Sequence, residues 1–328
     1  MRKSSLFRII AAGALAASVV SVGVVATAGT SSATVRTPKP VVYYLSLGDS
    51  YGIGYQPTAP GSGGTPGFTA YVAKKEKMTL ENFACGGATT SSLLYGFPVD
   101  GVGGTAEDPT PGCGDPAATD AVAYPDTTQE TAALDFINTP ANFGKVGLVT
   151  VSISGNDVTS CAVAGNPVTC VVAAGTAITT NVTQLANDLY AALDANGDST
   201  AKIVGLTYPD VLLGAAVYPT LDPTSSLPSE SVIAFDDIIN PDLLAAYTSV
   251  PDGSFVNVTQ AQYKKAGAGD DSTGTSYPDV KLRPYGEVSP ALWEVCELTY
   301  YCTLGNIHAN TKGYDFIGGL IYASIGKI

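Results

Sequence analysis

The stretch Val41–Leu47 reads VVYYLSL and runs directly into Gly48-Asp49-Ser50-Tyr51. A short, nearly continuous apolar run is typical of a central strand in a parallel sheet, where both faces are buried. Val146–Ile153 and Lys202–Tyr208 have the same character, and the first of them ends in Ser154-Gly155-Asn156-Asp157. The sequence therefore predicts at least three parallel strands, two of which end in polar turns.

Helical patterns lie between these runs. Phe68–Lys77 is one, and Ala173–Asn196 is the clearest, with an apolar face made of Ile178, Val182, Leu185, Leu189 and Leu193. The C-terminal segment repeats apolar residues at helical spacing from Tyr314 to Ile325, with Asn310 or Thr311 as the expected N-cap. Strands that alternate with helices predict a parallel α/β sheet. Ligands of such sheets bind beyond the carboxyl ends of the strands.

Two long segments do not fit the strand–helix pattern. Tyr95–Asp126 is dense in Gly, Pro and Asp, and Asp210–Gly253 combines Pro-rich turns with a helical patch at Ile233–Tyr247. We interpret both as excursions from the scaffold that form walls of a substrate cleft. The alternative is that they only cover the edges of the sheet. The chain has no internal repeat and no interdomain linker, so one domain is expected over residues 34–328.

Residues 1–33 have the layout of a secretory signal peptide. Arg2, Lys3 and Arg8 precede an uncharged stretch, and small-residue cleavage signals follow at 26–28 and 31–33. The alternative is a retained anchor, because about 20 apolar residues can span a bilayer. The cleavage signals favour removal, and no later run is long enough to cross a membrane. We therefore expect a secreted protein without a stable membrane anchor.

The charge limits the classes of ligand. The formal net charge is −13, and loss of the three cations of the leader takes it to −16. An acidic surface argues against nucleic acid and against polyanionic substrates. A mature chain of about 295 residues can build one large core.

The six cysteines are even in number, and an exported chain forms disulfides by default. Fifteen pairings are possible in principle. The simplest is sequential: Cys85 with Cys113, Cys161 with Cys170, and Cys296 with Cys302. A zinc site is a poor alternative, because there is no Cys-x-x-Cys pair and His308 is the only histidine. No metal or other cofactor is expected.

Four short motifs carry residues suited to nucleophilic catalysis. Gly48-Asp49-Ser50 offers a serine at a strand end, Cys85–Thr90 contains adjacent glycines, Ser154–Asp157 offers an amide, and His308 offers a base. Each motif also has an ordinary structural explanation as a turn, a cap or a buried histidine.

Taken together and in this order, the motifs resemble the SGNH, or GDSL, hydrolase family. The chain is most similar to its secreted bacterial esterases and lipases, which carry three short-range disulfides. The resemblance implies a three-layer α/β/α, flavodoxin-like sandwich. It implies Ser50 as nucleophile and His308 as general base. It also implies an oxyanion hole formed by the backbone N–H groups of Ser50 and Gly87 and the side-chain amide of Asn156.

One departure from the family pattern concerns the histidine. The family usually has Asp three residues before it, whereas this chain has Gly305. We expect a Ser50–His308 dyad in which the Gly305 carbonyl accepts from the imidazole. A relocated acid is the alternative, with Glu294, Glu297 and Asp315 as candidates. A Cys296–Cys302 bridge would clamp the loop that leads to His308.

The resemblance therefore implies a serine hydrolase that acts on carboxylic esters, with a small-molecule or lipid ester as substrate. Fatty acyl esters are favoured over acetylated sugars. A carbohydrate acetylesterase, or a non-catalytic carbohydrate or cell-wall binding protein on the same scaffold, remains the alternative. A monomer is expected.

Overall fold

The structure is a computed structural model that describes residues 40–58, 66–97, 112–113, 118–163, 165–218, 226–265, 280–284 and 286–326. The expected signal peptide, residues 1–33, lies outside these ranges. Residues 40–328 form one compact unit.

The centre of this unit is a five-stranded parallel sheet with the strand order β2-β1-β3-β4-β5. The strands are β1 (Tyr43–Gly48), β2 (Thr79–Asn82), β3 (Val146–Ser152), β4 (Lys202–Leu206) and β5 (Gly253–Val256). The three central strands are those that the apolar runs predict. The two edge strands are only four residues long and lack an apolar run, so the sequence pattern did not reveal them.

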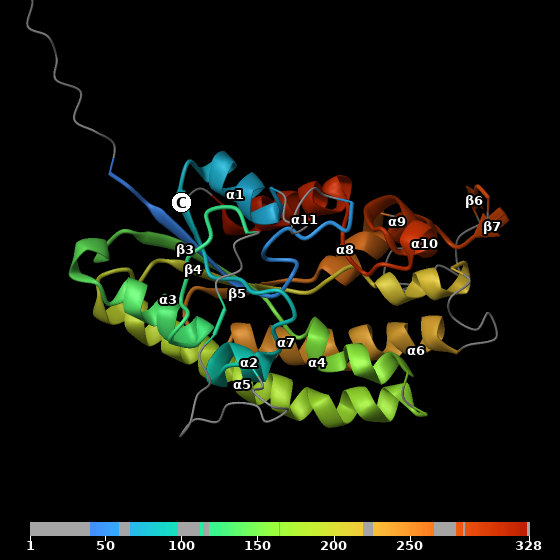
Figure 1. The fold of residues 1–328 in the computed structure, drawn as a ribbon, viewed down its shortest axis with the longest axis horizontal. Coiled ribbons are helices and arrows are strands. Elements are labelled where there is room, and N and C mark those ends of the chain that lie inside the picture. The colour runs from blue at the N-terminus through green and yellow to red at the C-terminus, as the bar shows by residue number, and fades with distance from the viewer. Residues whose placement is uncertain are drawn as a thin grey trace, which may run out of the picture. The chain divides into compact units, whose positions relative to one another are not determined.

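Helices cover both faces of the sheet (Figure 1). One layer contains α1 (Phe68–Glu76), α8 (Val258–Lys265), α9 (Pro290–Leu298), α10 (Tyr301–Leu304) and α11 (Thr311–Ile325). The other contains α2 (Thr90–Tyr95), α3 (Gln129–Ile137), α4 (Gly155–Thr159), α5 (Pro167–Ala195), α6 (Leu227–Ile233) and α7 (Asn240–Tyr247). Shorter elements are the helical turns η1 (Pro140–Asn142), η2 (Ser160–Val163) and η3 (Val211–Ala216), the π-helix η4 (Ala234–Ile239), and the hairpin strands β6 (Val280–Leu282) and β7 (Gly286–Val288). The predicted three-layer α/β/α architecture is confirmed.

Alternate residues of each strand enter separate cores. Leu45 on β1 packs in the same cluster as Leu185 and Leu189 of α5, whereas Tyr44 packs with Phe68 of α1 and Ile317 of α11. This is the alternation expected of a strand that is covered on both faces. α5 is long and apolar enough to cross a bilayer by composition, but its buried residues pack in the core of this unit.

The ends of the predicted helices follow from local capping. Asn310 is the N-cap of α11, and its side chain accepts from the backbone N–H of Gly313 at 3.1 Å. α5 begins six residues before the predicted start, because Asn166 caps it and Pro167 occupies the first turn. The three sequential disulfides, Cys85–Cys113, Cys161–Cys170 and Cys296–Cys302, are all present.

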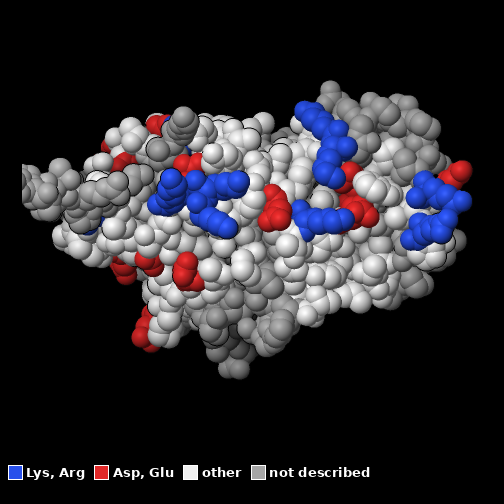
Figure 2. Space-filling model, turned by 90° about the horizontal axis from the view of Figure 1, so that it is seen from above, with Lys and Arg blue, Asp and Glu red and all other residues white. Residues whose placement is uncertain are grey.

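The basic side chains of the chain are distributed unevenly. Figure 2 views the face of α1, α9 and α11, where lysines and arginines lie among acidic groups. Lys312 of α11 forms an ion pair with Glu297 of α9, and Lys265 of α8 forms one with Glu294 of α9. The opposite layer differs, since α2, α3, α5, α6 and α7 contain no Lys or Arg. The surface of that layer is therefore acidic or uncharged.

We expect Gly48→Ala to lower the free energy of unfolding by about 3 kcal/mol. A Cβ at Gly48 would lie 2.1 Å from the carbonyl oxygen of Ser152, and the φ of Gly48 is +136°. Gly144→Ala is the control, because its φ is +68° but nothing lies within 4 Å of the added Cβ. It is expected to cost about 1–2 kcal/mol. Equal losses in urea unfolding would contradict a steric constraint at Gly48.

Candidate active site

Ser50 lies in a turn directly beyond β1. The backbone N–H of Asp49 donates to Ser152 at 3.0 Å, and the carbonyl of Ser50 accepts from Tyr55 at 3.0 Å. The side chain of Gln129 on α3 holds the Gly48 peptide by two bonds, accepting from its N–H at 2.5 Å and donating to its carbonyl at 3.0 Å. The turn is therefore attached both to β3 and to the helical layer. Sequence reasoning missed Gln129, because an isolated glutamine carries no motif signal.

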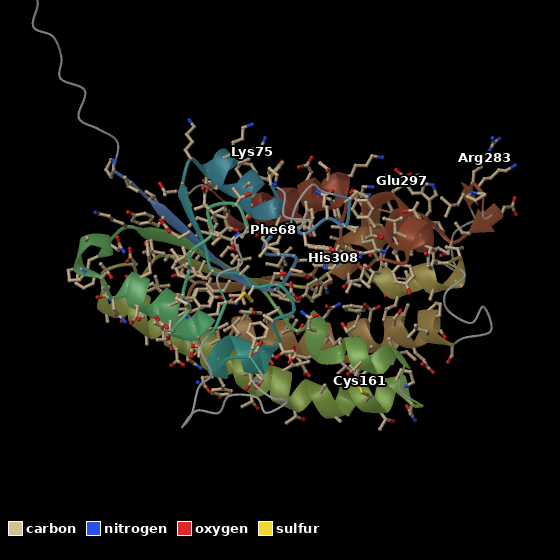
Figure 3. The ribbon with its side chains drawn as sticks, in the orientation of Figure 1. Phe68, Lys75, Cys161, Arg283, Glu297 and His308 are labelled. Carbon is tan, nitrogen blue, oxygen red and sulfur yellow. A yellow bond between two sulfur atoms is a disulfide. The ribbon has the colours of Figure 1, made fainter. Side chains whose placement is uncertain are left out.

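His308 lies opposite Ser50, in the loop between α10 and α11. Its Nε2 is 2.7 Å from the Oγ of Ser50, so the structure joins residues that are 258 positions apart. The loop pairs with the segment after α9: the carbonyl of His308 accepts from Tyr300 at 3.0 Å, and Asn310 donates to Leu298 at 2.9 Å. Figure 3 labels His308 near the centre of the unit, with Phe68 and Lys75 above the sheet and Cys161 below it.

The second ring nitrogen of His308 contacts the side chain of Asn306, which is not among the predicted site residues. Nδ1 is 2.8 Å from Oδ1 of Asn306, which also accepts from the backbone N–H of His308 at 3.1 Å. The expectation that the Gly305 carbonyl occupies this position is wrong. Asn306 forms an Asx-turn two residues before the histidine, and this local bond brings its oxygen to the ring.

The candidates for a relocated acid have other places. Glu294 and Glu297 pair with Lys265 and Lys312, and Asp315 is exposed on α11. An aspartate three residues before the histidine would also meet an obstacle. A Cβ on Gly305 would lie 2.4 Å from the ring of Tyr218, and the φ of Gly305 is +63°. The departure from the family pattern thus coincides with a position where a side chain does not fit.

The surroundings of His308 favour a neutral imidazole. Burial lowers the pKa of His308 to about 4, because the cationic form loses hydration. Rings of Tyr51 and Tyr55 contact the imidazole, with centroid distances of 5.8 and 4.4 Å. Since Oδ1 of Asn306 can only accept, Nδ1 carries the hydrogen and Nε2 is free to accept from Ser50.

The other two predicted site residues lie on neighbouring loops. The side-chain nitrogen of Asn156, in the first turn of α4, donates to the carbonyl of Ala88 at 2.8 Å. Gly87 is exposed with φ +81°, and no atom lies within 4 Å of a Cβ added there. The N–H of Cys85 donates to the Gly48 carbonyl at 2.9 Å, so the Gly87 loop begins beside the end of β1.

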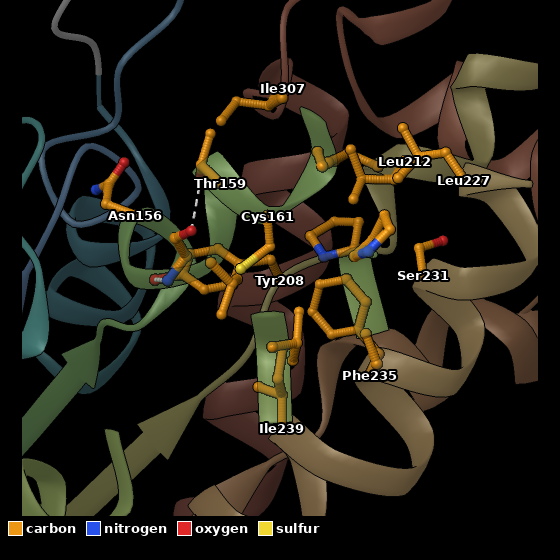
Figure 4. A pocket seen from close by; sticks show the side chains of 18 of the residues that line it. Asn156, Thr159, Cys161, Tyr208, Leu212, Leu227, Ser231, Phe235, Ile239 and Ile307 are labelled. Atoms are coloured by element: carbon orange, nitrogen blue, oxygen red, sulfur yellow. Dashed lines mark hydrogen bonds between the residues drawn. The ribbon is translucent and has the colours of Figure 1, made fainter. Parts of the chain in front are cut away.

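A cleft that is partly open to solvent begins at Ser50 and Asn156 (Figure 4). Its further walls are mostly apolar and come from η2, α5, η3, α6 and η4; they include Cys161, Val171, Leu212, Leu227, Phe235 and Ile239. The segment after β4 thus forms a cleft wall, as the sequence analysis expected of Asp210–Gly253. Most of the other excursion, Tyr95–Asp126, lies outside the described residues.

A buried carboxylate, that of Asp49, directly precedes Ser50 in the chain. Asp49 is 2% exposed and accepts from the Tyr51 N–H at 2.9 Å and from the Tyr208 hydroxyl at 2.7 Å. Burial raises the pKa of Asp49 to about 7, although the bonds from these two donors act to lower it. Tyr208 was not a predicted site residue, although it also lines the cleft. Within the described ranges, no group of three His, Cys, Asp or Glu side chains could hold a metal ion.

No protein-family model and no curated protein match the chain. Solved structures do resemble it. A lipase from a goat rumen metagenome has a TM-score of 0.47 and 15% identity, covering 88% of this chain and 98% of that one. A phospholipase A1 from Streptomyces albidoflavus has a TM-score of 0.40 and 17% identity, and the match covers 78% of this chain and 99% of that one. A catalytic mutant of an acetylxylan esterase from Geobacillus stearothermophilus has a TM-score of 0.43 and 13% identity, and the match covers 88% of this chain and 96% of that one. Likenesses at this level carry no argument about activity, which therefore depends on the geometry of the site.

We expect the imidazole of His308 to titrate with a midpoint near pH 4, against about 6.5 for an ordinary histidine. Because it is the only histidine in the chain, its ring resonances can be followed by NMR without assignment by mutation. A midpoint at 6 or above would contradict a desolvated neutral ring.

A matched pair of variants tests the position of Asn306. Asn306→Asp places a carboxylate against Nδ1 and is expected to raise the midpoint by about 1–3 pH units. Gly305→Asp introduces the same charge one residue earlier, where the Cβ meets Tyr218, and is expected to lower the melting temperature instead.

Proposed function

We propose that this chain is a serine hydrolase of the SGNH family that cleaves carboxylic esters. The observation that carries the proposal is the 2.7 Å approach of Ser50 Oγ to His308 Nε2, at the mouth of an apolar cleft. A serine hydroxyl needs a base within this distance to act as a nucleophile. Three disulfides suit an oxidising compartment, which supports secretion.

The chemistry has two stages. Ser50 Oγ attacks the ester carbonyl while its proton moves to Nε2 of His308, giving a tetrahedral oxyanion. This intermediate collapses, the C–O bond to the alcohol breaks, and the alcohol leaves with the proton from Nε2. Water then attacks the acyl-Ser50 ester, giving its proton to the same nitrogen, and the acid leaves as the serine recovers its proton.

The oxyanion would be stabilised by the N–H groups of Ser50 and Gly87 and by the amide of Asn156. Asn156 uses one of its two N–H bonds on the Ala88 carbonyl, so the second remains for the substrate. That bond also fixes which end of the amide is the donor. Preorganised donors of this kind are worth about 3–4 kcal/mol each in the transition state.

Asn306 takes the orienting position that an aspartate has in a catalytic triad. Its neutral oxygen fixes the tautomer and the ring plane of His308 but gives less stabilisation to the imidazolium than a carboxylate would. The missing aspartate at Gly305 would favour a non-catalytic protein, and the contact between Asn306 and His308 supports a catalytic one. The base is held, and its low pKa keeps it neutral at the pH of most extracellular fluids.

The acyl chain of the substrate would occupy the apolar cleft. Val171, Leu212 and Phe235 line the same cleft as Ser50 and offer apolar contact to such a chain. An acetyl group would leave most of this surface unused, whereas a longer acyl chain would bury it. Esters of fatty acids are therefore favoured over acetylated sugars.

Wild-type protein is expected to hydrolyse p-nitrophenyl butyrate. Ser50→Ala and His308→Ala should each reduce kcat by about 10⁴-fold or more, since each removes a group that the covalent step requires. A fluorophosphonate probe should label wild type and leave Ser50→Ala unlabelled. If wild type is as inert as both variants in the two assays, the protein is not a serine hydrolase.

Chain length separates the two substrate classes. We expect kcat/KM for p-nitrophenyl butyrate to exceed that for the acetate about tenfold, from two more methylenes at about 0.8 kcal/mol each. Ala234→Phe, in the cleft wall, should retain acetate turnover and lose octanoate turnover. Ile233→Phe is the control, because Ile233 is 43% exposed and does not line the cleft. A preference for acetate in wild type would instead favour a carbohydrate acetylesterase.

A further inference from the structure

The loops that carry Gly87 and Asn156 are joined by adjacent residues. Asn156 donates to the Ala88 carbonyl at 2.8 Å, and the next residue, Asp157, binds Thr90. Both carboxylate oxygens of Asp157 accept from the Thr90 N–H, at 3.1 and 3.0 Å, and one accepts from the Thr90 hydroxyl at 2.6 Å. Gly87 therefore lies one residue before the first attachment point and three before the second.

The attachment extends into the helical layer. Thr90 is 2% exposed at the start of α2, and Asn181 of α5 donates to its hydroxyl at 3.1 Å. Asp157 is thus linked to α2 directly and to α5 through Thr90. The Thr89 side chain and Ser92 form a reciprocal capping box, so the start of α2 is itself fixed.

We infer that Asp157 is a positioning residue that sets the spacing between the Gly87 N–H and the Asn156 amide. The inference rests on the proposed function, because it concerns the oxyanion hole of that reaction. Gly87 is exposed, its φ is +81°, and no atom of the described residues lies within 4 Å of a Cβ added there, so side-chain packing does not hold this glycine in place. Asp157 is the side chain that links the Asn156 turn to the far side of that loop.

A purely structural role would be the capping of α2 by a carboxylate. That role predicts a loss of stability with kcat unchanged. A positioning role predicts a loss in kcat at nearly constant KM, because the oxyanion forms only in the transition state. Measurements of kcat and KM therefore distinguish the two roles, even though both depend on the same hydrogen bonds between Asp157 and Thr90.

The test uses the full chain and p-nitrophenyl butyrate. Asp157→Ala is expected to lower kcat by about 10–100-fold, less than or equal to the loss of one oxyanion donor, with KM within about threefold. The affinity for a butyl trifluoromethyl ketone, whose adduct with Ser50 places an oxyanion in the hole, should fall by a similar factor. Asp157→Asn should retain kcat within about threefold, since its amide can accept from the Thr90 N–H and donate to the hydroxyl.

Controls keep the test decisive if Asp157→Ala folds poorly. Thr90→Val removes the two bonds of the hydroxyl, to Asp157 and from Asn181, and should lower kcat by severalfold. Thr90→Ser keeps the hydroxyl and should retain kcat. Asp194→Ala, at an exposed site near the end of α5, should change nothing. If Asp157→Ala or Thr90→Val matches Asp194→Ala in kcat, or if Asp157→Asn is as slow as Asp157→Ala, the positioning role is overturned. An inert wild type would instead overturn the proposed function.

Discussion

The close approach of β1 to β3 at the end of the sheet determines the geometry of the whole site. Gly48 packs so near Ser152 that a side chain does not fit between the strands, and the next N–H, that of Asp49, donates to the same Ser152 carbonyl. Both strands then end in turns: β1 leads into the turn that holds Ser50, and β3 leads into the turn that holds Asn156. Because the strands are parallel and adjacent, their polar turns leave at the same edge. The rest of the site is built on these two turns.

The charge state of His308 follows from what surrounds it. Its ring contacts two tyrosine rings and a neutral amide, and among the described residues no carboxylate binds it, so an imidazolium would lose hydration without a charged partner. An aspartate in the place of Asn306 would bind the imidazolium more strongly and raise its pKa. The neutral arrangement gives up part of that stabilisation, but it keeps His308 unprotonated in mildly acidic surroundings. Orienting the imidazole and stabilising its positive charge are therefore separate functions, and Asn306 can perform only the first.

The sequence predicted those parts of the molecule that depend on local pattern. The sequence predicted the three central strands, the long helix α5 and the cap at Asn310, because burial on both faces and helix capping leave signals within a few residues. The edge strands β2 and β5 carry no such signal. At the site, Ser50 and His308 were found through motifs, whereas Asn306 was missed in favour of Gly305. The Asn306 oxygen reaches the ring through a local Asx-turn, which the spacing of the family motif does not indicate. Gln129 and Tyr208 were missed because an isolated glutamine or tyrosine carries no motif signal.

The disulfides support the site as well as the fold. Each joins residues close in sequence, with separations of 28, 9 and 6. Short loops restrict the unfolded chain less than long ones, but a crosslink over such a loop still contributes about 2–4 kcal/mol to global stability. Their positions are more telling. Cys85 lies two residues before Gly87, Cys161 lines the cleft just after α4, and Cys302 precedes the His308 loop. Each crosslink therefore restrains a segment next to the site. A covalent restraint at that place resists the local opening that exposed loops otherwise undergo, in addition to its effect on the global free energy of unfolding.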